Sequence, residues 1–322
     1  RVGAGGVLFI GTDIAGDVVR FRQGDPNAMP PGDELQKWGY AGERPDYLFE
    51  ADFDPTAPHD RPADWPLLAI RHIAEHELEA AADPVLPHGA PCAIVLTGDT
   101  DGATTAHYKL QRQMLGDLPI TYFLRTACAA ERETLLALEH DERVDLQLHP
   151  DALDAPQRYG ALLQEQIAFF DHAIGRRPRL VRNHGYLNEG YWRHAAHWLA
   201  LGQDWSANLP GVDGKVLNGS LLPGRLALGG KLTSHWSIVT AYGDGMMFAL
   251  GLSGEDAAGR ISAHVEEITQ SGAPGLLTIN LHPANVHHTG ALHEVLHRLS
   301  DAGVLMWSLA QCAAWFEAAD NV

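Results

Sequence analysis

Two aspartates separated by one residue, Asp99 and Asp101, stand where an apolar run of strand length ends. Three histidines, His149, His184 and His282, stand at or just after the ends of other short apolar runs. Histidine and aspartate are ordinary ligands of a catalytic divalent metal, which commonly takes three of them and leaves one position open. A further carboxylate can act as a general base and a further histidine as a general acid. These five residues therefore predict one metal-dependent hydrolytic site.

The segments that carry these residues alternate between strand-like and helix-like patterns from about residue 91 onward. Such alternation indicates right-handed crossovers and a mainly parallel sheet, in which ligands bind at the carboxyl ends of the strands. Six or more such units can close into a barrel, and an open doubly wound sheet is the alternative. Residues 206–254 are rich in glycine and predict loops and short antiparallel pieces. We expect strands at 92–97, 119–124, 144–148, 179–182, 275–281 and 304–308, and helices at 67–82, 104–115, 130–139, 157–174, 189–201, 255–271 and 289–301.

The motifs at these strand ends resemble those of the polysaccharide deacetylases, the NodB-homology or carbohydrate esterase family 4 group, over about residues 90–318. The family's first motif, Thr-Phe-Asp-Asp-Gly, is similar to the stretch Thr97–Gly102, whose Asp-x-Asp spacing occurs in divergent branches. By this resemblance Asp99 is the base and Asp101 a metal ligand. The final motif corresponds to the stretch ending at His282, which the resemblance makes the general acid. It also implies a distorted (β/α) barrel and a divalent metal, with zinc favoured.

The second motif of the family, His-(Ser/Thr)-x-x-His-Pro, is only half present. His149 matches its second histidine, whereas Asp145 stands where the first is expected. Divergent branches of this form often carry Arg-x-His further along the chain, and here an Arg-Asn-His stretch ends at His184. The resemblance therefore implies a ligand set of Asp101, His149 and His184, with Asp145 as the alternative third ligand.

Several other side chains are candidates for supporting roles. Arg182 is expected to orient the base Asp99 through a charge-assisted hydrogen bond, although a purely structural ion pair is the alternative. Four residues are candidates for substrate binding, and each also fits an ordinary structural or solvent-exposed role: Tyr186, Asp204, Trp205 and His287.

The region before residue 67 differs from the rest of the chain. Residues 7–10 form an apolar strand-like run, and eight prolines between residues 25 and 66 exclude long helices and central strands there. The first 24 residues resemble the last strand and helix of a glutamine-amidotransferase-like domain, which implies that the chain continues a longer protein. We therefore expect an N-terminal strand and proline-rich arm over residues 1–66 and a deacetylase-like barrel over residues 67–322.

The resemblance implies an enzyme that removes an acyl group, such as acetyl, from an N- or O-acylated carbohydrate. Because the second motif is incomplete, a degenerate barrel that binds carbohydrate without chemistry is one alternative. A metal hydrolase of a related barrel that cleaves another C–N bond or a glycosidic bond is another. No G-x-S-x-G elbow supports a serine nucleophile, and no glycine-rich loop follows a strand as a dinucleotide site requires.

Composition narrows the classes of partner. A net charge of −18 argues against a nucleic-acid surface and against docking on anionic lipid. The three cysteines, Cys92, Cys128 and Cys312, lie too far apart for a thiolate zinc site or a disulfide framework. No apolar run approaches the ~20 residues of a membrane span, and no signal-peptide pattern opens the chain, which slightly favours the cytoplasm. The expected partner is a carbohydrate substrate, and the oligomeric state stays open.

Overall fold

The computed structural model describes residues 13–29, 43–50, 62–77, 84–127, 130–212 and 214–320. One sheet occupies its centre, with the strand order β7-β8-β5-β4-β3-β2-β1-β10-β9, while β11 pairs with β1 and β6 with β5. Neighbouring strands are parallel except in the β5–β6 and β7–β8 pairs, so the predicted α/β class is confirmed. The strands are β1 (Cys92–Asp99), β2 (Ile120–Leu124), β3 (Val144–Leu148), β4 (Leu180–Val181), β5 (Trp205–Val212), β6 (Lys215–Val216), β7 (Gly224–Leu228), β8 (Lys231–Thr240), β9 (Tyr242–Gly243), β10 (Gly275–Asn280) and β11 (Leu305–Ser308).

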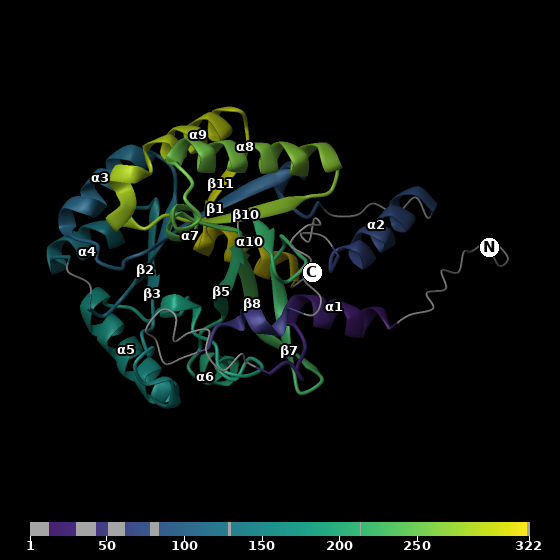
Figure 1. Ribbon diagram of the computed structural model, residues 1–322, viewed down its shortest axis with the longest axis horizontal. Helices are drawn as coiled ribbons and strands as arrows, with labels where there is room; N and C mark the ends of the chain where they lie inside the picture. Colours follow the sequence, from purple (N-terminus) through teal and green to yellow (C-terminus); the bar gives the residue numbers. More distant parts are fainter. Residues whose placement is uncertain are drawn as a thin grey trace.

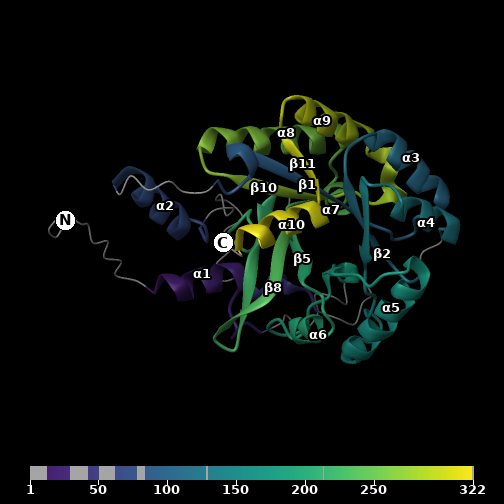
Figure 2. The ribbon, with the colours of Figure 1, turned by 180° about the vertical axis from the view of Figure 1, so that it is seen from behind.

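Helices surround this sheet. Figure 1 shows α8 and α9 side by side along one flank and α3, α4 and α5 continuing around the outside. The helix α10 instead lies across the strands, as the view from behind in Figure 2 shows. The α-helices are α1 (Ile14–Gln23), α2 (Trp65–Glu77), α3 (Thr105–Leu115), α4 (Arg132–Glu139), α5 (Tyr159–Ile174), α6 (Ala195–Ala200), α7 (Asp244–Ala249), α8 (Gly254–Ser271), α9 (Gly290–Asp301) and α10 (Leu309–Asp320).

The alternation of side chains along β1 separates an inner layer from an outer one. Ala93 and Val95 join an inner apolar cluster with residues of β5, β8 and α10, whereas Ile94 and Leu96 join the cluster beneath the outer helices. Every residue of β1 is buried, as expected for a strand covered on both faces. Because side chains alternate with a period of two, Asp99 continues the inner column at the carboxyl end of the strand.

The sheet curves so that its two halves approach each other. At one end of the hydrogen-bonded path, β9 and β10 lie against β5 and β8. Arg182, just after β4, crosses the interior and donates hydrogen bonds to Thr97 of β1, Asn280 of β10 and Thr240 of β8. The hydrogen-bonded path runs from β7 to β9 without closing into a ring. This curved arrangement is the distorted (β/α) barrel that the sequence predicts.

The structure differs from the sequence-based prediction in two regions. Residues 206–254, expected as loops and short antiparallel pieces, contain most of β5 and the long strand β8, which is parallel to β5 within the main sheet. The helix expected at 189–201 is confined to α6, because Gly190 and Trp192 adopt positive φ values of 57° and 53° that a right-handed helix excludes. The strand expected at residues 7–10 lies outside the described residues.

The N-terminal segments lie against the β7 edge of the sheet. The Gln23 side chain donates to the carbonyl of Ala227 and accepts from its N–H, at 3.0 and 2.6 Å, so it pairs with β7 much as a further strand would. Arg22 forms an ion pair of 2.9 Å with Asp64, which joins α1 to the segment before α2. Among the described residues, no helix has the length and apolar character that a membrane crossing requires.

Candidate active site

The candidate catalytic side chains and their partners converge at the carboxyl ends of six strands. Asp99 ends β1, and Asp101 lies two residues beyond it. His149 follows β3 directly, where its N–H donates to the carbonyl of Leu124 and so extends the ladder to β2. The remaining elements add His184 after β4, Thr240 at the end of β8, Asp244 after β9, and Asn280 and His282 at the end of β10.

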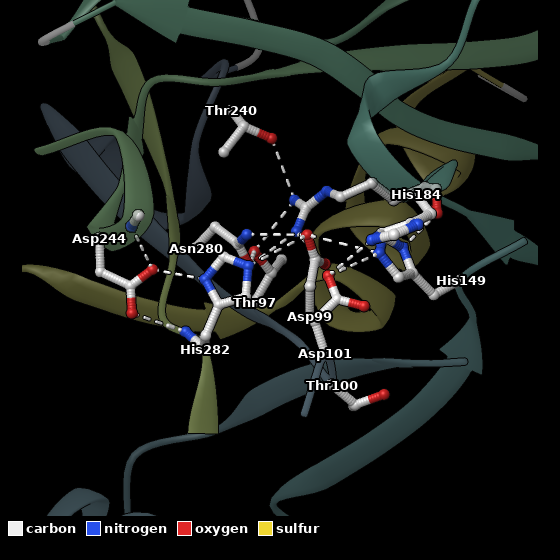
Figure 3. Close-up of polar contacts among 12 residues, drawn as sticks. Thr97, Asp99, Thr100, Asp101, His149, His184, Thr240, Asp244, Asn280 and His282 are labelled. Carbon is white, nitrogen blue, oxygen red and sulfur yellow. Dashed lines mark hydrogen bonds and ion pairs between the residues drawn. The ribbon is translucent and has the colours of Figure 1, made fainter. Parts of the chain in front are cut away.

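Asp101, His149 and His184 form a cluster with the geometry of a metal site. Their ligand atoms lie within 4.8 Å of one another. Asp101 Oδ2 lies 3.5 Å from His149 Nε2 and 3.4 Å from His184 Nε2. The two imidazole rings are 5.3 Å apart and face the carboxylates from one side, as Figure 3 shows. One carboxylate and two histidine nitrogens thus point at a common space.

The state of His149 shows that this space fits a cation. Its Nδ1 lies 2.6 Å from the carbonyl oxygen of Arg182, which can only accept, so Nδ1 carries the proton. In the neutral imidazole the Nε2 atom then presents a lone pair, and it is buried without a hydrogen-bond partner among the described residues. Two histidine nitrogens and a carboxylate are a donor set typical of zinc and similar divalent metals.

Asp99 is held by a fully buried arginine. Arg182 Nη1 donates to Asp99 Oδ1 at 2.9 Å, and Asn280 Nδ2 donates to Asp99 Oδ2 at 2.9 Å. Arg182 also donates through Nε to the carbonyl of Ala207 at 3.1 Å, and each of its nitrogens has at least one acceptor. Burial raises the pKa of Asp99, but the Arg182 charge and the neighbouring histidines together outweigh burial, and the pKa is lowered. Asp99 is therefore ionised and able to accept a proton.

His282 stands on the other flank and is oriented by Asp244 (Figure 3). Its Nδ1 lies 2.5 Å from Asp244 Oδ1, and its backbone N–H donates to Asp244 Oδ2 at 2.9 Å. Its Nε2 lies 4.0 Å from Asp99 Oδ2. Burial lowers the pKa of His282, but the carboxylates of Asp244, Asp99 and Asp101 outweigh burial and raise the pKa to about 9, with the largest contribution from Asp244. At neutral pH this histidine carries a proton that it can donate.

Two residues of the cluster, Asp101 and His184, have strongly shifted pKa values. Burial raises the pKa of Asp101, yet His149 and His184 lower it to well below the usual range of an aspartate. Burial lowers the pKa of His184, whereas Asp101 and Asp151 together raise it to about 9 in the metal-free protein. A cation bound in this cluster would therefore replace a proton, and its affinity would depend on pH.

No protein-family model matches the sequence, and no curated protein is significantly similar to it. Solved structures are similar in fold. A Mycobacterium smegmatis protein assigned as a polysaccharide deacetylase superposes with a TM-score of 0.56 at 17% identity, covering 75% of this chain and 96% of that one. A Pseudomonas aeruginosa PAO1 protein with the same assignment gives 0.51 at 13% identity, covering 74% and 95%. The allantoinase PuuE gives 0.57 at 14% identity, covering 74% and 94%.

The chain has the fold that these three structures share. Its fold covers nearly the whole length of these three structures, so the described barrel corresponds to their complete domains. At these identities the likeness concerns the fold, and the chemistry has to be argued from the site itself.

Within this fold, the alternative ligand Asp145 lies away from the cluster. It is the second residue of β3, four residues before His149 along an extended strand. Its carboxylate accepts hydrogen bonds from Thr121 at 3.1 Å and from Gln147 at 2.9 Å, and it lies 3.4 Å from Arg176. These partners occupy the carboxylate, and the residue that lies together with Asp101 and His149 is His184.

The candidates for substrate binding fall into two groups. Tyr186 lies beside the site, with its ring centre 5.9 Å from the Arg182 guanidinium and a positive φ of 57° that strains its backbone. His287 is exposed in the turn after β10 and packs edge-on against His107 at 6.0 Å, near the start of α3. Asp204 and Trp205 do not join the site, because they stand at the amino end of β5.

Four further residues contribute to the site without having been predicted. Asp244 orients His282, Asn280 holds Asp99, and Asp151 and Arg125 lie behind the ligand cluster. Asp244 falls in the stretch that the sequence predicts as loops, so no strand end marked it as a candidate. Asp151 comes two residues after His149, and its closeness to a candidate ligand is the signal that could have found it.

Proposed function

We propose that this protein is a metal-dependent hydrolase that removes an acyl group, such as acetyl, from an N- or O-acylated carbohydrate. The observation that carries the proposal is the convergence of Asp101, His149 and His184 beside an ionised aspartate and a protonated histidine. Three metal ligands, a base and an acid are the parts that metal-assisted acyl hydrolysis requires.

Asp101, His149 and His184 would hold the metal, and zinc is the identity we propose from the donor set. A divalent cation held there would supply Lewis-acid polarisation of the acyl carbonyl. His149 is prepared for this role, since its Nδ1–H donates to the Arg182 carbonyl and its Nε2 lone pair faces the cluster.

Asp99 and His282 each carry out one of the two proton transfers. Asp99, kept ionised by Arg182, accepts the proton of the attacking water. His282, kept protonated by Asp244, donates a proton to the departing amine or alcohol. Asp99 Oδ2 lies 4.0 Å from both His149 Nε2 and His282 Nε2, so one reacting group can lie within reach of all three side chains.

A carbohydrate substrate is supported by the fold shared with proteins assigned as polysaccharide deacetylases. Tyr186 offers a ring beside the reacting groups, and His287 offers an exposed imidazole on the neighbouring turn. Both are side-chain types that contact sugars, and we assign them to the wall of the substrate site.

The test is zinc content combined with acetate release from N-acetylated chitin oligomers and O-acetylated xylan. The purified chain should hold about one zinc and release acetate, and a chelator should stop the release until zinc is returned. Asp101→Ala and His149→Ala should lose both metal and activity, whereas Asp145→Asn, a matched change outside the cluster, should keep both.

Three outcomes would contradict the proposal. Full metal content and activity in Asp101→Ala and His149→Ala would remove the ligand assignment. Glycan binding without zinc and without acetate release would identify a degenerate binding barrel. New reducing ends without acetate, or hydrolysis of a cyclic amide such as allantoin alone, would identify a different substrate for the same site.

A further inference from the structure

His184 is the ligand that stands in for the missing first histidine of the second motif, and its ring lies between two carboxylates. Its Nε2 is 3.4 Å from Asp101 Oδ2, on the side of the ligand cluster. Its Nδ1 is 3.3 Å from Asp151 Oδ1, on the side away from it. A proton on Nδ1, facing the Asp151 carboxylate, would leave the Nε2 lone pair directed at the cluster, which is the tautomer a metal requires.

Arg125 connects this outer carboxylate with the inner one. Its Nη1 lies 3.3 Å from Asp101 Oδ1, and its Nη2 donates to Asp151 Oδ2. Asp101 Oδ1 is thereby engaged, and Oδ2, which faces both histidines, is the oxygen left for a cation. The guanidinium also offsets the charge of two carboxylates that lie close to each other.

The scaffold fixes both members of this pair. Arg125 follows β2 directly, and its N–H donates to Thr100 Oγ1 at 3.0 Å, within the loop between Asp99 and Asp101. The backbone of Asp151 is held twice by the buried Gln166 of α5, which accepts from its N–H at 2.9 Å and donates to its carbonyl at 2.8 Å. The protein therefore sets the position of these groups before any cation binds.

We propose that Arg125 and Asp151 are positioning residues of the metal site: Asp151 orients His184, and Arg125 holds Asp151 and Asp101 in place. This pair makes a histidine from the β4 end usable as a third ligand where the second motif supplies one histidine instead of two. The inference rests on the proposed metal site and adds to it the residues that set its affinity. Outer partners of metal ligands typically contribute about 10- to 100-fold to metal affinity.

The experiment measures the zinc dissociation constant of the full chain by competition with a chromophoric chelator, together with the visible spectrum of the Co²⁺-loaded protein. Asp151→Ala should weaken zinc binding by about 10- to 100-fold and change the Co²⁺ spectrum. Asp151→Asn, which retains an oxygen acceptor for His184, should recover part of this loss. Arg125→Gln should weaken binding by about tenfold, because Asp151 and His184 remain paired.

Arg143→Gln is the matched control, since Arg143 makes comparable ion pairs with Asp141 and Asp117 on the surface. It should leave zinc affinity and the Co²⁺ spectrum unchanged. If the wild type binds zinc and Asp151→Ala and Arg125→Gln bind it equally well, the positioning role is wrong while the metal site stands. If the wild type binds no zinc, the proposed function and this inference are both overturned. Should Asp151→Ala fail to fold, Asp151→Asn and Arg125→Gln decide the question.

Discussion

At the carboxyl ends of the strands the Arg182–Asp99 pair lies among groups that can exchange protons, whereas at the amino ends the Arg176–Asp145 pair lies among groups that hold the fold. Asp99 is 4.0 Å from His149 Nε2 and is ionised, because Arg182 and the neighbouring histidines together outweigh its burial. Burial instead raises the pKa of Asp145, and its neighbours only partly oppose that effect.

The two pairs have the same residue types, yet they differ in what surrounds them. Around Asp99, side chains with unused lone pairs or transferable protons meet in one space. Around Asp145, the donors Thr121, Gln147 and Arg176 are directed at the carboxylate itself. A site is therefore marked by polar groups whose partners are missing or movable, and the presence of an ion pair alone does not mark one.

The largest expected effect comes from replacing the carboxylate at the functional end. Asp99→Asn should reduce kcat by about 10²- to 10⁴-fold, because the amide cannot accept the proton of the attacking water. Zinc content should stay at the wild-type level, since Asp99 is not one of the three clustered ligands. The matched change Asp145→Asn should keep kcat within about twofold. Equal losses in the two variants would abolish the distinction between the two ends.

The arginines should differ in the stability they provide. Arg182→Met leaves Asp99 buried beside a neutral side chain, and breaking such a buried pair costs about 3–5 kcal/mol of unfolding free energy at pH 7.5. The Arg176 side chain is 37% exposed, so Arg176→Met should cost only about 1 kcal/mol of unfolding free energy. Urea unfolding of both variants measures these losses.

The unfolding free energy lost in Arg182→Met should depend on pH, and the sign of this dependence follows from the pKa of Asp99. In the wild type, the lowered pKa of Asp99 contributes stability above the unfolded pKa that is lost as the pH falls. In Arg182→Met, burial without the cation raises this pKa, so the penalty at neutral pH is relieved as the carboxylate is protonated. The difference between the two proteins should shrink from pH 7.5 toward pH 4. A difference that is independent of pH would mean that Arg182 stabilises the barrel by packing alone.

A smaller effect on kcat, visible at alkaline pH, is expected when Asp244, the partner of the general acid His282, is replaced. Asp244, together with Asp99 and Asp101, raises the pKa of His282 to about 9, so wild-type activity should persist until the pH approaches that value. Asp244→Asn removes the largest of these contributions and lowers the pKa toward the ordinary histidine value of about 6.5. At pH 8 the protonated fraction, and with it kcat, should fall roughly 30-fold, while at pH 6 the two proteins should differ by less than about twofold. Parallel pH–rate profiles would contradict the role of His282 as the acid.

The catalytic candidates at the functional end could be predicted from the sequence more completely than the residues that orient them. Asp99 and Asp101 could be found because an apolar strand ends at them, and parallel strands place such ends together. Asp244 could not be found in this way, because β9 is a two-residue strand inside a stretch without a clear strand–helix rhythm. Asp204 and Trp205 lie where a strand begins. The sequence alone does not tell whether such residues lie at the amino end or the carboxyl end of a strand. Strand direction, which only the assembled sheet gives, decides which end a residue occupies.

The smallest expected effect concerns Trp205 at the structural end. Its indole is buried, stacks on Trp236 at 5.2 Å and donates from Nε1 to Glu317 of α10 at 2.8 Å. Trp205→Phe removes that hydrogen bond and some packing, but Glu317 keeps its ion pair with Arg179 at 3.0 Å. The cost should therefore be about 1–2 kcal/mol in unfolding free energy. Because no catalytic group touches Trp205, kcat and KM should stay within about twofold of the wild type. A rise in KM with unchanged stability would instead place Trp205 in the substrate site and remove the separation between the two ends of the barrel.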